Sequence, residues 1–270
     1  MERKNIELDE KNNEFWNELC GTHLASVLGI EGDSAADLKR FDDWYLDYYQ
    51  YLSGFLPQHV KGKDLLEIGL GYGTISSMFM AAGANYTGID ISNGPVNMSL
   101  HRAQLLGVKN NAMVASALNL PFEDNSFDHV VSIGCLHHTG DLTKGLAEVM
   151  RVLKKGGSAH VMVYNLLSYR QLIDTPLRTL VNFLRPASTL KFQNVFDERY
   201  DANSDGVAAP ETVYVKKSQL RAMFGKQNIT RIYATNIGSD GPFKKMDRNV
   251  ALKYFGPFLG LDLYAISEKQ

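Results

Sequence analysis

Residues 65–74 constrain the fold of this chain more than any other stretch. They read Leu-Leu-Glu-Ile-Gly-Leu-Gly-Tyr-Gly-Thr, an apolar strand that passes through Glu67 into three alternating glycines. Glycine adopts positive φ without steric cost and has no Cβ, so such a turn can approach a ligand closely. A helix is expected from Thr74 onward. The turn is therefore placed at the carboxyl end of a strand, where α/β sheets bind their ligands.

The glycine spacing excludes two common phosphate-binding motifs. A dinucleotide fingerprint, Gly-x-Gly-x-x-Gly, would put its third glycine at position 74, which is Thr. A P-loop would need Gly-Lys-Ser/Thr at the start of the helix, and no lysine stands there. What remains is Glu-x-Gly-x-Gly-x-Gly. The carboxylate of Glu67 repels a pyrophosphate but suits a ligand that carries an amino acid and a sulfonium, so the pattern indicates a site for S-adenosylmethionine.

A second acid supports this interpretation. Residues 85–90 form a short strand that ends in Asp90, 23 residues after Glu67. In a doubly wound sheet, an acid at the end of the second strand accepts hydrogen bonds from a ribose diol. The alternative is an Asx turn or a cap for the helix expected at 95–106.

Three further motifs follow in order. They are Leu-Pro-Phe at 120–122 leading into Asp-Asn-Ser-Phe-Asp at 124–128, Leu-His-His at 136–138, and Arg-Val-Leu-Lys-Lys-Gly-Gly at 151–157. With these motifs the chain resembles the class I S-adenosylmethionine-dependent methyltransferases, in particular the small-molecule, methyltransferase-11-like branch. The resemblance covers residues 55–165 well and both ends poorly.

Strand and helix patterns alternate along the chain, which predicts a parallel sheet covered on both faces. Strands are expected at 64–68, 85–90, 111–115, 128–133 and 158–164, and helices at 74–82, 95–106 and 142–153. A helix at 217–225 and strands at 229–235 and 260–267 would complete the sheet. The prediction is an α/β fold with a doubly wound, seven-stranded, mostly parallel sheet of the Rossmann-like methyltransferase kind.

Four regions are expected. Residues 1–60 form a helical N-terminal extension or cap, and 61–165 form the S-adenosylmethionine-binding core. Residues 166–212 form an insertion after the fifth strand on the substrate side, with leucine-rich helix over 172–184 and a polar, turn-rich end. Residues 213–270 complete the sheet.

Composition narrows the classes of partner. The chain has 28 Lys+Arg against 30 Asp+Glu, and this balance gives no electrostatic footprint for nucleic acid. Two cysteines, Cys20 and Cys135, are too few for a disulfide framework and predict a reducing cytoplasm. The N-terminus lacks the apolar core of a signal peptide, and no run approaches the roughly 18 apolar residues of a membrane span. A small-molecule substrate is expected, and the oligomeric state is left open.

The resemblance assigns the cofactor site to the ends of the first four strands. The residues are Glu67, Gly69, Leu70, Gly71, Gly73, Asp90, Ile91, Ser116, Ala117, Leu118, Ile133 and Gly134. Glu67 would hold the loop amides or the methionine ammonium. Ser116 departs from the family, which commonly has an acid there that accepts a hydrogen bond from the adenine amino group. In this chain the Ser116 hydroxyl or a carbonyl would have to accept the hydrogen bond from the adenine amino group.

The acceptor side is less defined. His138 and His137 follow the fourth strand, and an imidazole, with an ordinary pKa of about 6.5, suits proton removal near neutral pH. The alternative is that the pair orders the loop or packs on the cofactor. No metal is expected, because adjacent histidines without a third ligand do not make a site. The substrate-binding candidates are Tyr45, Tyr72, Tyr164, Arg170, Arg199 and Tyr200. An inward arginine would favour a carboxylate or phosphate on the substrate.

The predicted function is transfer of a methyl group from S-adenosylmethionine to oxygen, nitrogen, carbon or sulfur of a small molecule by in-line displacement. Two alternatives stay open. One is a non-catalytic cofactor-binding protein whose substrate pocket is closed. The other is an oxidoreductase on a similar sheet, against which the missing glycine at position 74 argues.

Overall fold

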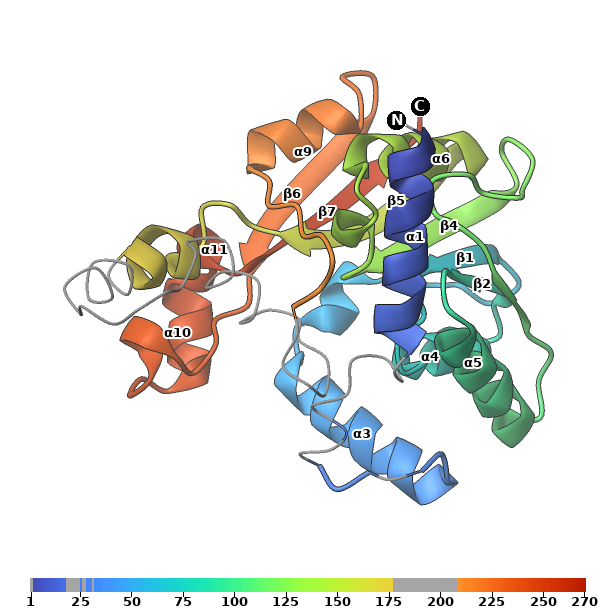
Figure 1. Cartoon of the computed structure of the whole chain (residues 1–270), viewed down its shortest axis with the longest axis horizontal. Coiled ribbons are helices and arrows are strands. Elements are labelled where there is room, and N and C mark those ends of the chain that lie inside the picture. The colour runs from blue at the N-terminus through green and yellow to red at the C-terminus, as the bar shows by residue number, and fades with distance from the viewer. Residues whose placement is uncertain (1, 18–24, 26–27, 31, 177–207) are drawn as a thin grey trace.

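The computed structural model describes residues 2–17, 25, 28–30, 32–176 and 208–270. Within these, the chain forms one seven-stranded sheet in the order β3-β2-β1-β4-β5-β7-β6 (Figure 1). The strands are β1 (Asp64–Ile68), β2 (Asn85–Asp90), β3 (Asn111–Val114), β4 (Phe127–Ile133), β5 (Leu153–Tyr164), β6 (Ile229–Thr235) and β7 (Asp262–Glu268). Strand β7 pairs antiparallel with both of its neighbours, and the other pairings are parallel. The predicted mostly parallel α/β sheet is confirmed.

The sheet is buried on both faces because its central strands carry apolar side chains on both sides. In β1, Leu66 and Ile68 pack on one face with helices α6 and α9, while Leu65 packs on the other with α4 and the turn at 52–55. The helices are α1 (Glu2–Asn17), α3 (Ala35–Tyr48), α4 (Thr74–Ala81), α5 (Asn93–Leu106), α6 (Leu142–Val152), α9 (Lys217–Met223), α10 (Arg248–Tyr254) and α11 (Gly256–Leu259). Strands that bury apolar side chains on both faces, as β1 does, are typical of parallel sheets.

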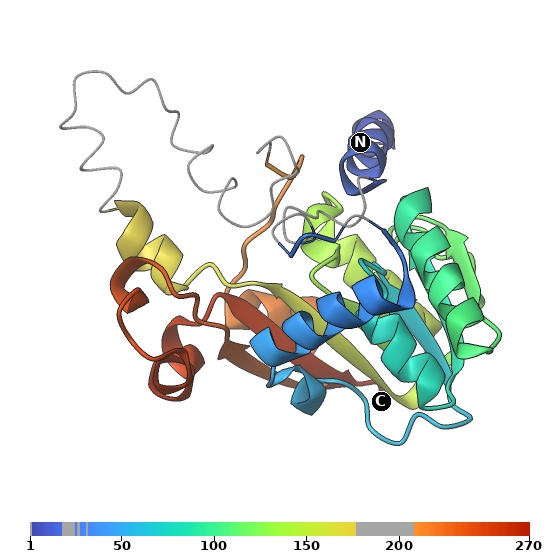
Figure 2. The ribbon, with the colours of Figure 1, turned by 90° about the horizontal axis from the view of Figure 1, so that it is seen from below.

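Several boundaries differ from the sequence-based expectation. Helix α5 begins at Asn93, two residues earlier than predicted, and β5 begins at Leu153 because it already pairs with Phe127 there. Helices α10 and α11, between β6 and β7, were not predicted; they lie at the opposite end of the molecule from α5 (Figure 2). Of the helix expected at 172–184, the described residues include a π-helical turn at Arg170–Asp174. Residues 177–207 lie outside the described part, so the predicted four-region division stays a prediction.

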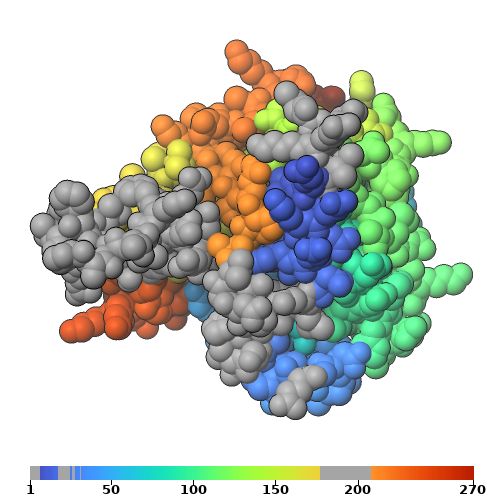
Figure 3. Space-filling view, in the orientation of Figure 1, coloured from blue at the N-terminus to red at the C-terminus, as the bar shows by residue number. Residues whose placement is uncertain are grey.

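The N-terminal helices lie over the carboxyl edge of the parallel strands. Helix α1 lies on the surface between the orange segment that begins at residue 208 and the green helices (Figure 3). Its contacts with the core include two hydrogen bonds: the Asn12 Nδ2 donates to the His138 carbonyl at 2.9 Å, and the Ser92 hydroxyl donates to the Asn13 carbonyl at 3.2 Å. Within the described parts of the chain, no helix combines the length and apolarity needed to cross a membrane.

Candidate cofactor and acceptor site

A cavity of about 320 Å³ opens at the carboxyl edge of the sheet, where β1, β2 and β4 end. The strand order turns from descending to ascending between β1 and β4, and open α/β sheets bind ligands at such a switch point. Turns after these strands form the floor, and α1 and α3 contribute walls from the N-terminal region.

The glycine turn uses its three glycines for different physical reasons. All three have positive φ: 82° at Gly69, 51° at Gly71 and 77° at Gly73. A Cβ on Gly69 would lie 2.3 Å from the Cβ of Cys135, and one on Gly73 would lie 2.7 Å from the Cδ of Arg102. A Cβ on Gly71 would meet no atom within 4 Å. Gly71 therefore lets bare backbone face the cavity, while the other two make room for packing.

Gly73 also permits a contact that anchors the N-terminal helix α3. The Arg102 guanidinium makes a bidentate ion pair with the Asp42 carboxylate, with N–O distances of 2.8 and 2.9 Å. The Thr74 hydroxyl donates to the same carboxylate at 2.5 Å. A forked pair of this geometry orients both partners. The ion pair fixes the helix that carries aromatic residues of the cavity wall.

Asp90, at the end of β2, holds the glycine turn from below. Its Oδ2 accepts from the Leu70 amide at 2.9 Å, and its Oδ1 accepts from the Ser92 amide at 3.0 Å. Burial raises the pKa of Asp90 to about 6, although these amides oppose the rise. Each oxygen keeps a second lone pair, so the carboxylate still has acceptor capacity for a diol in the cavity.

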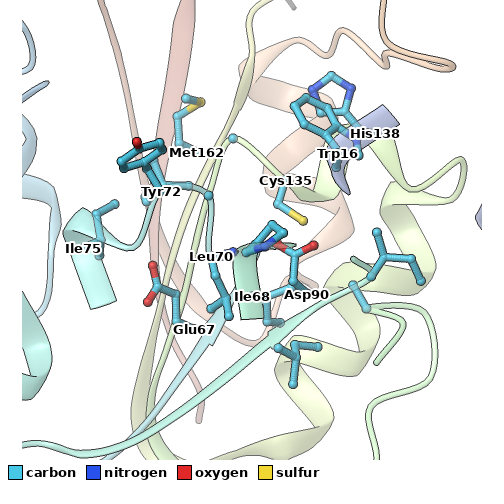
Figure 4. A pocket seen from close by; sticks show the side chains of 18 of the residues that line it. Trp16, Glu67, Ile68, Leu70, Tyr72, Ile75, Asp90, Cys135, His138 and Met162 are labelled. Carbon is cyan, nitrogen blue, oxygen red and sulfur yellow. Dashed lines mark hydrogen bonds between the residues drawn. The ribbon is translucent and has the colours of Figure 1, made fainter. Parts of the chain in front are cut away.

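Glu67 lies at the wall of the cavity and is 2% exposed. The hydroxyls of Tyr86 and Ser76 donate to its Oε2 at 2.6 and 2.7 Å, so Oε1 has no hydrogen-bond partner among the described residues. Burial raises the pKa of Glu67 to about 7, with the Asp90 charge acting in the same direction and the two hydroxyls against it. The loop amide that the sequence allowed for Glu67 is held by Asp90 instead. Glu67 is left free to meet a cationic group of the ligand (Figure 4).

Next to Asp90 and Ser116, part of the cavity wall is apolar. Ile91, Pro95 and Ala117 contribute its apolar walls. Its polar rim consists of Ser116 and Asp9: the Ser116 hydroxyl accepts from the Leu118 amide at 3.3 Å and pairs with the Asp9 Oδ2 at 3.2 Å. Asp9 comes from α1, 107 residues away in the chain.

Much of the remaining cavity wall is aromatic. Its walls come from α1, α3, β5, β7 and the turn after β4, with Trp16, Trp44, Tyr45, Tyr49, Tyr164, Tyr264 and Met162. Rings of Tyr45 and Tyr49 lie 4.8 Å apart, centroid to centroid. Among the described residues, no lysine or arginine lines the cavity. This side suits an uncharged or cationic acceptor with a planar ring.

The two histidines have different environments. His138 lines the cavity, and its ring lies 5.1 Å from that of Trp16 (Figure 4). Its Nδ1 lies 2.8 Å from the Glu211 carbonyl, which accepts only, so the neutral ring carries its proton on Nδ1 and a lone pair on Nε2. His137 is fully buried behind it, with its ring 4.1 Å from Tyr164. Burial and the neighbouring His138 hold the pKa of His137 well below its ordinary value.

The structure brings most of the predicted site residues to the cavity wall. These are Glu67, Gly69, Leu70, Gly71, Asp90, Ile91, Ser116, Ala117, Ile133, Gly134, His138, Tyr45, Tyr72 and Tyr164. Gly73, Leu118 and His137 pack behind the wall. Arg170 is not at the cavity; its Nε pairs with Asp240 at 3.1 Å, beyond the end of β5. Arg199 and Tyr200 lie outside the described residues.

Sequence reasoning missed the wall residues contributed from a distance. They include Asp9, Asn12, Trp16, Phe41, Trp44, Tyr49, Met162 and Tyr264. The dense aromatic run at 44–51 was a signal for part of this set. Asp9, Asn12 and Trp16 share one face of α1 at helical spacing, but nothing in the sequence says that this face meets the sheet edge.

The residues present fit S-adenosylmethionine. Gly71 provides a cradle that a Cβ would fill, and two buried carboxylates lie where a ribose diol and an ammonium would be bound. Cations are absent from the described wall, which suits a ligand that carries a sulfonium.

Comparison with known proteins also points to a methyltransferase domain. Residues 66–161 match the methyltransferase-11 family model, described as a methyltransferase domain. Norajmaline N-methyltransferase of Rauvolfia serpentina is 30% identical over 159 residues, covering 55% of this chain and 53% of that protein. Demethylmenaquinone methyltransferase of Clavibacter sepedonicus is 38% identical over 99 residues, covering 36% of this chain and 40% of that protein. The chain thus spans about half, or less, of the length of these curated relatives.

Solved structures extend the likeness to the whole fold. The magnesium protoporphyrin IX methyltransferase of Synechocystis PCC 6803, solved with bound SAH, has a TM-score of 0.57 at 13% identity. The likeness covers 97% of this chain and 100% of that one. A possible histamine N-methyltransferase of Thermotoga maritima has a TM-score of 0.54 at 18% identity, covering 86% and 96%. The fold is shared, and the methyltransferase resemblance seen in the motifs is confirmed for residues 66–161, which match a methyltransferase domain.

Proposed function

We propose that this protein transfers a methyl group from S-adenosylmethionine to a small molecule that carries a planar ring and no anionic group. The observation that carries the proposal is one continuous cavity with two unlike ends. One end has the glycine turn and two buried carboxylates, and the other has aromatic walls without a cation among the described residues. Bound S-adenosylmethionine would supply an electrophilic methyl group, so the protein needs to bind, align and exclude water.

Cofactor binding would rest on three groups. The Asp90 carboxylate would accept from the ribose hydroxyls, the Glu67 Oε1 would accept from the ammonium, and the Gly71 backbone would lie against the ligand. The burial of both carboxylates strengthens such contacts, because the local dielectric is low.

His138 would remove the proton that the acceptor loses. The Glu211 carbonyl accepts from Nδ1 and so fixes the tautomer that is basic at Nε2, and the ring lines the cavity. Trp16 packs on the same ring and fixes its plane. His137 would act as a packing residue, because burial keeps it neutral.

The aromatic walls favour a class of acceptor. Aromatic rings bind planar rings by stacking and bind ammonium groups through their faces. The arginine that would have favoured a carboxylate or phosphate, Arg170, is paired with Asp240 away from the cavity. Two relatives are named for small-molecule acceptors, norajmaline and demethylmenaquinone. An aromatic amine or phenol is the acceptor that these observations favour; a cytoplasmic location, expected from cysteine usage, stays a prediction.

A panel assay tests the proposal. Purified protein is incubated with S-adenosylmethionine and matched sets of aromatic amines, phenols, aromatic carboxylates and sugar phosphates, and the demethylated product is quantified. Turnover confined to the first two sets is expected. Turnover of the anionic sets would contradict the acceptor class. Tight binding of S-adenosylhomocysteine without turnover of any set would favour the non-catalytic alternative.

A further inference from the structure

Asp9 lies in the cavity, although it belongs to the N-terminal helix and to no motif of the core. Its Oδ2 pairs with the Ser116 hydroxyl at 3.2 Å, and its Oδ1 has no hydrogen-bond partner among the described residues. The side chain is half-buried and lines the same cavity as Asp90. This oxygen is therefore an acceptor that a donor group of a ligand in the cavity can reach.

The pairing of β2 with β3 places Ser116, the hydrogen-bond partner of Asp9, close to Asp90. Asp90 and Val114 are register partners, and the Ala115 amide donates to the Asp90 carbonyl at 2.9 Å. Ser116 therefore lies beside Asp90 at the sheet edge, and Asp9 lies above Ser116. In a nucleoside whose ribose hydroxyls bind Asp90, the base would lie toward Ser116, away from the glycine turn whose Leu70 amide donates to Asp90.

On that side the residues lining the cavity include the apolar side chains of Ile91, Pro95 and Ala117. A purine ring fits between apolar walls of this kind, and its edge then meets the rim. The rim offers one acceptor, the Asp9 carboxylate, and one hydroxyl that already accepts from the Leu118 amide. A carboxylate accepts from an exocyclic amine and repels a carbonyl at the same place.

We infer that Asp9 of α1 reads the exocyclic amino group of adenine, so that the N-terminal helix is part of the cofactor site and selects adenine over a 6-oxo purine. The inference rests on the proposed function, since it takes the cavity to be the site of S-adenosylmethionine.

The same helix extends from the base to the acceptor. Asp9, Asn12 and Trp16 are spaced by three and four residues and lie on one face, and all three line the cavity. Seven residues of helix span about 10 Å. Asn12 donates to the His138 carbonyl, and Trp16 packs on the His138 ring. The helix therefore contacts both His138 and Ser116.

The test is a pair of calorimetric titrations, with S-adenosylhomocysteine and with S-inosylhomocysteine, in which a carbonyl oxygen replaces the amine. The intact protein is expected to bind the adenine compound about 10- to 150-fold more tightly, the range of a hydrogen bond to a charged acceptor. In Asp9→Asn the ratio should fall to near one, because an amide can rotate to donate to the carbonyl. Glu10→Ala, an exposed acid next to Asp9 on the same helix, should keep the ratio of the intact protein.

The outcomes separate this inference from the proposed function. If the intact protein binds neither compound, the cofactor site itself is wrong. If it binds both and Asp9→Asn keeps the ratio unchanged, Asp9 does not read the base. Asp9→Ala gives a second variant, expected to weaken the adenine compound more than the inosine compound. Hydrogen exchange over residues 7–17 gives an independent readout: the adenine compound should slow it, and the inosine compound should slow it less.

Discussion

The two ends of the cavity are built in opposite ways. Apart from Asp9, the cofactor end uses residues at or near strand ends within one stretch of the chain, from Glu67 to Gly134. The acceptor end gathers side chains from distant places, such as Trp16, Tyr49 and Tyr264. The family model covers residues 66–161, so it includes the strand-end residues and His138 but omits Asp9 and the aromatic wall. We therefore expect one core to serve many acceptors, because the aromatic wall lies outside it.

This comparison predicts separable effects. Changes at the cofactor end should alter the affinity for S-adenosylhomocysteine, and changes at the acceptor end should alter turnover at saturating cofactor. A variant that does both would show that the two ends are coupled.

The largest effect is expected at the acceptor end. His138→Ala should lower kcat by about 10²–10⁴, the usual contribution of a general base, while the affinity for S-adenosylhomocysteine stays unchanged. The measurement is steady-state turnover with the best acceptor of the panel. His59→Asn is the matched control, because His59 is exposed, lies away from the cavity and has a positive φ that asparagine tolerates. Equal losses of affinity and turnover in His138→Ala would make His138 a packing residue.

The next effect is expected at the turn. Gly71→Val should weaken S-adenosylhomocysteine binding by more than about 100-fold, because the branched side chain enters the space that the ligand needs. Gly156→Val is a matched control: its φ of 75° imposes similar strain, its Cβ also meets no atom within 4 Å, and it lies away from the cavity. Both variants should lose stability, and only the first should lose affinity. Similar affinities in calorimetry would show that strain, not space, is what glycine relieves at position 71.

Asp90→Ala should weaken binding by about 10- to 150-fold, because a buried carboxylate that accepts from the ribose diol is lost. The Leu70 amide loses its acceptor as well, so the turn should loosen. Asp90→Asn keeps one carbonyl oxygen, so its affinity should lie between those of the intact protein and Asp90→Ala. Calorimetry that finds unchanged affinity in both variants would remove Asp90 from the site. At saturating cofactor, kcat should stay close to that of the intact protein.

The same contrast explains which parts of the fold and of the site could be predicted from the sequence. The sheet, its helices and the glycine turn follow from local patterns, since a strand ending in Glu67 and glycines has few other uses. The acceptor for the base did not follow: a serine stands at position 116, and the acid comes from α1 through a contact of 107 residues in sequence separation. Arg170 was misplaced as a cavity candidate for a related reason, because its partner Asp240 lies far along the chain. Local sequence patterns do not record which distant segments meet.

The smallest effect is expected from the protonation of Glu67. Its pKa is raised to about 7 by burial, so at pH 6 the carboxyl of the free protein is mostly protonated. An ammonium on the ligand favours the ionised form, and binding at pH 6 should therefore release up to one proton. The sign follows: affinity for S-adenosylhomocysteine should rise with pH between 6 and 7, by at most about tenfold, and level off above 7. Below pH 6 the slope should steepen, because Asp90 has a raised pKa of about 6. Titrations in two buffers of different ionisation heat measure the released proton directly. In Glu67→Gln the release at pH 6 to 7 should fall to the smaller part that Asp90, with its pKa of about 6, contributes. An unchanged release would assign the proton to another group.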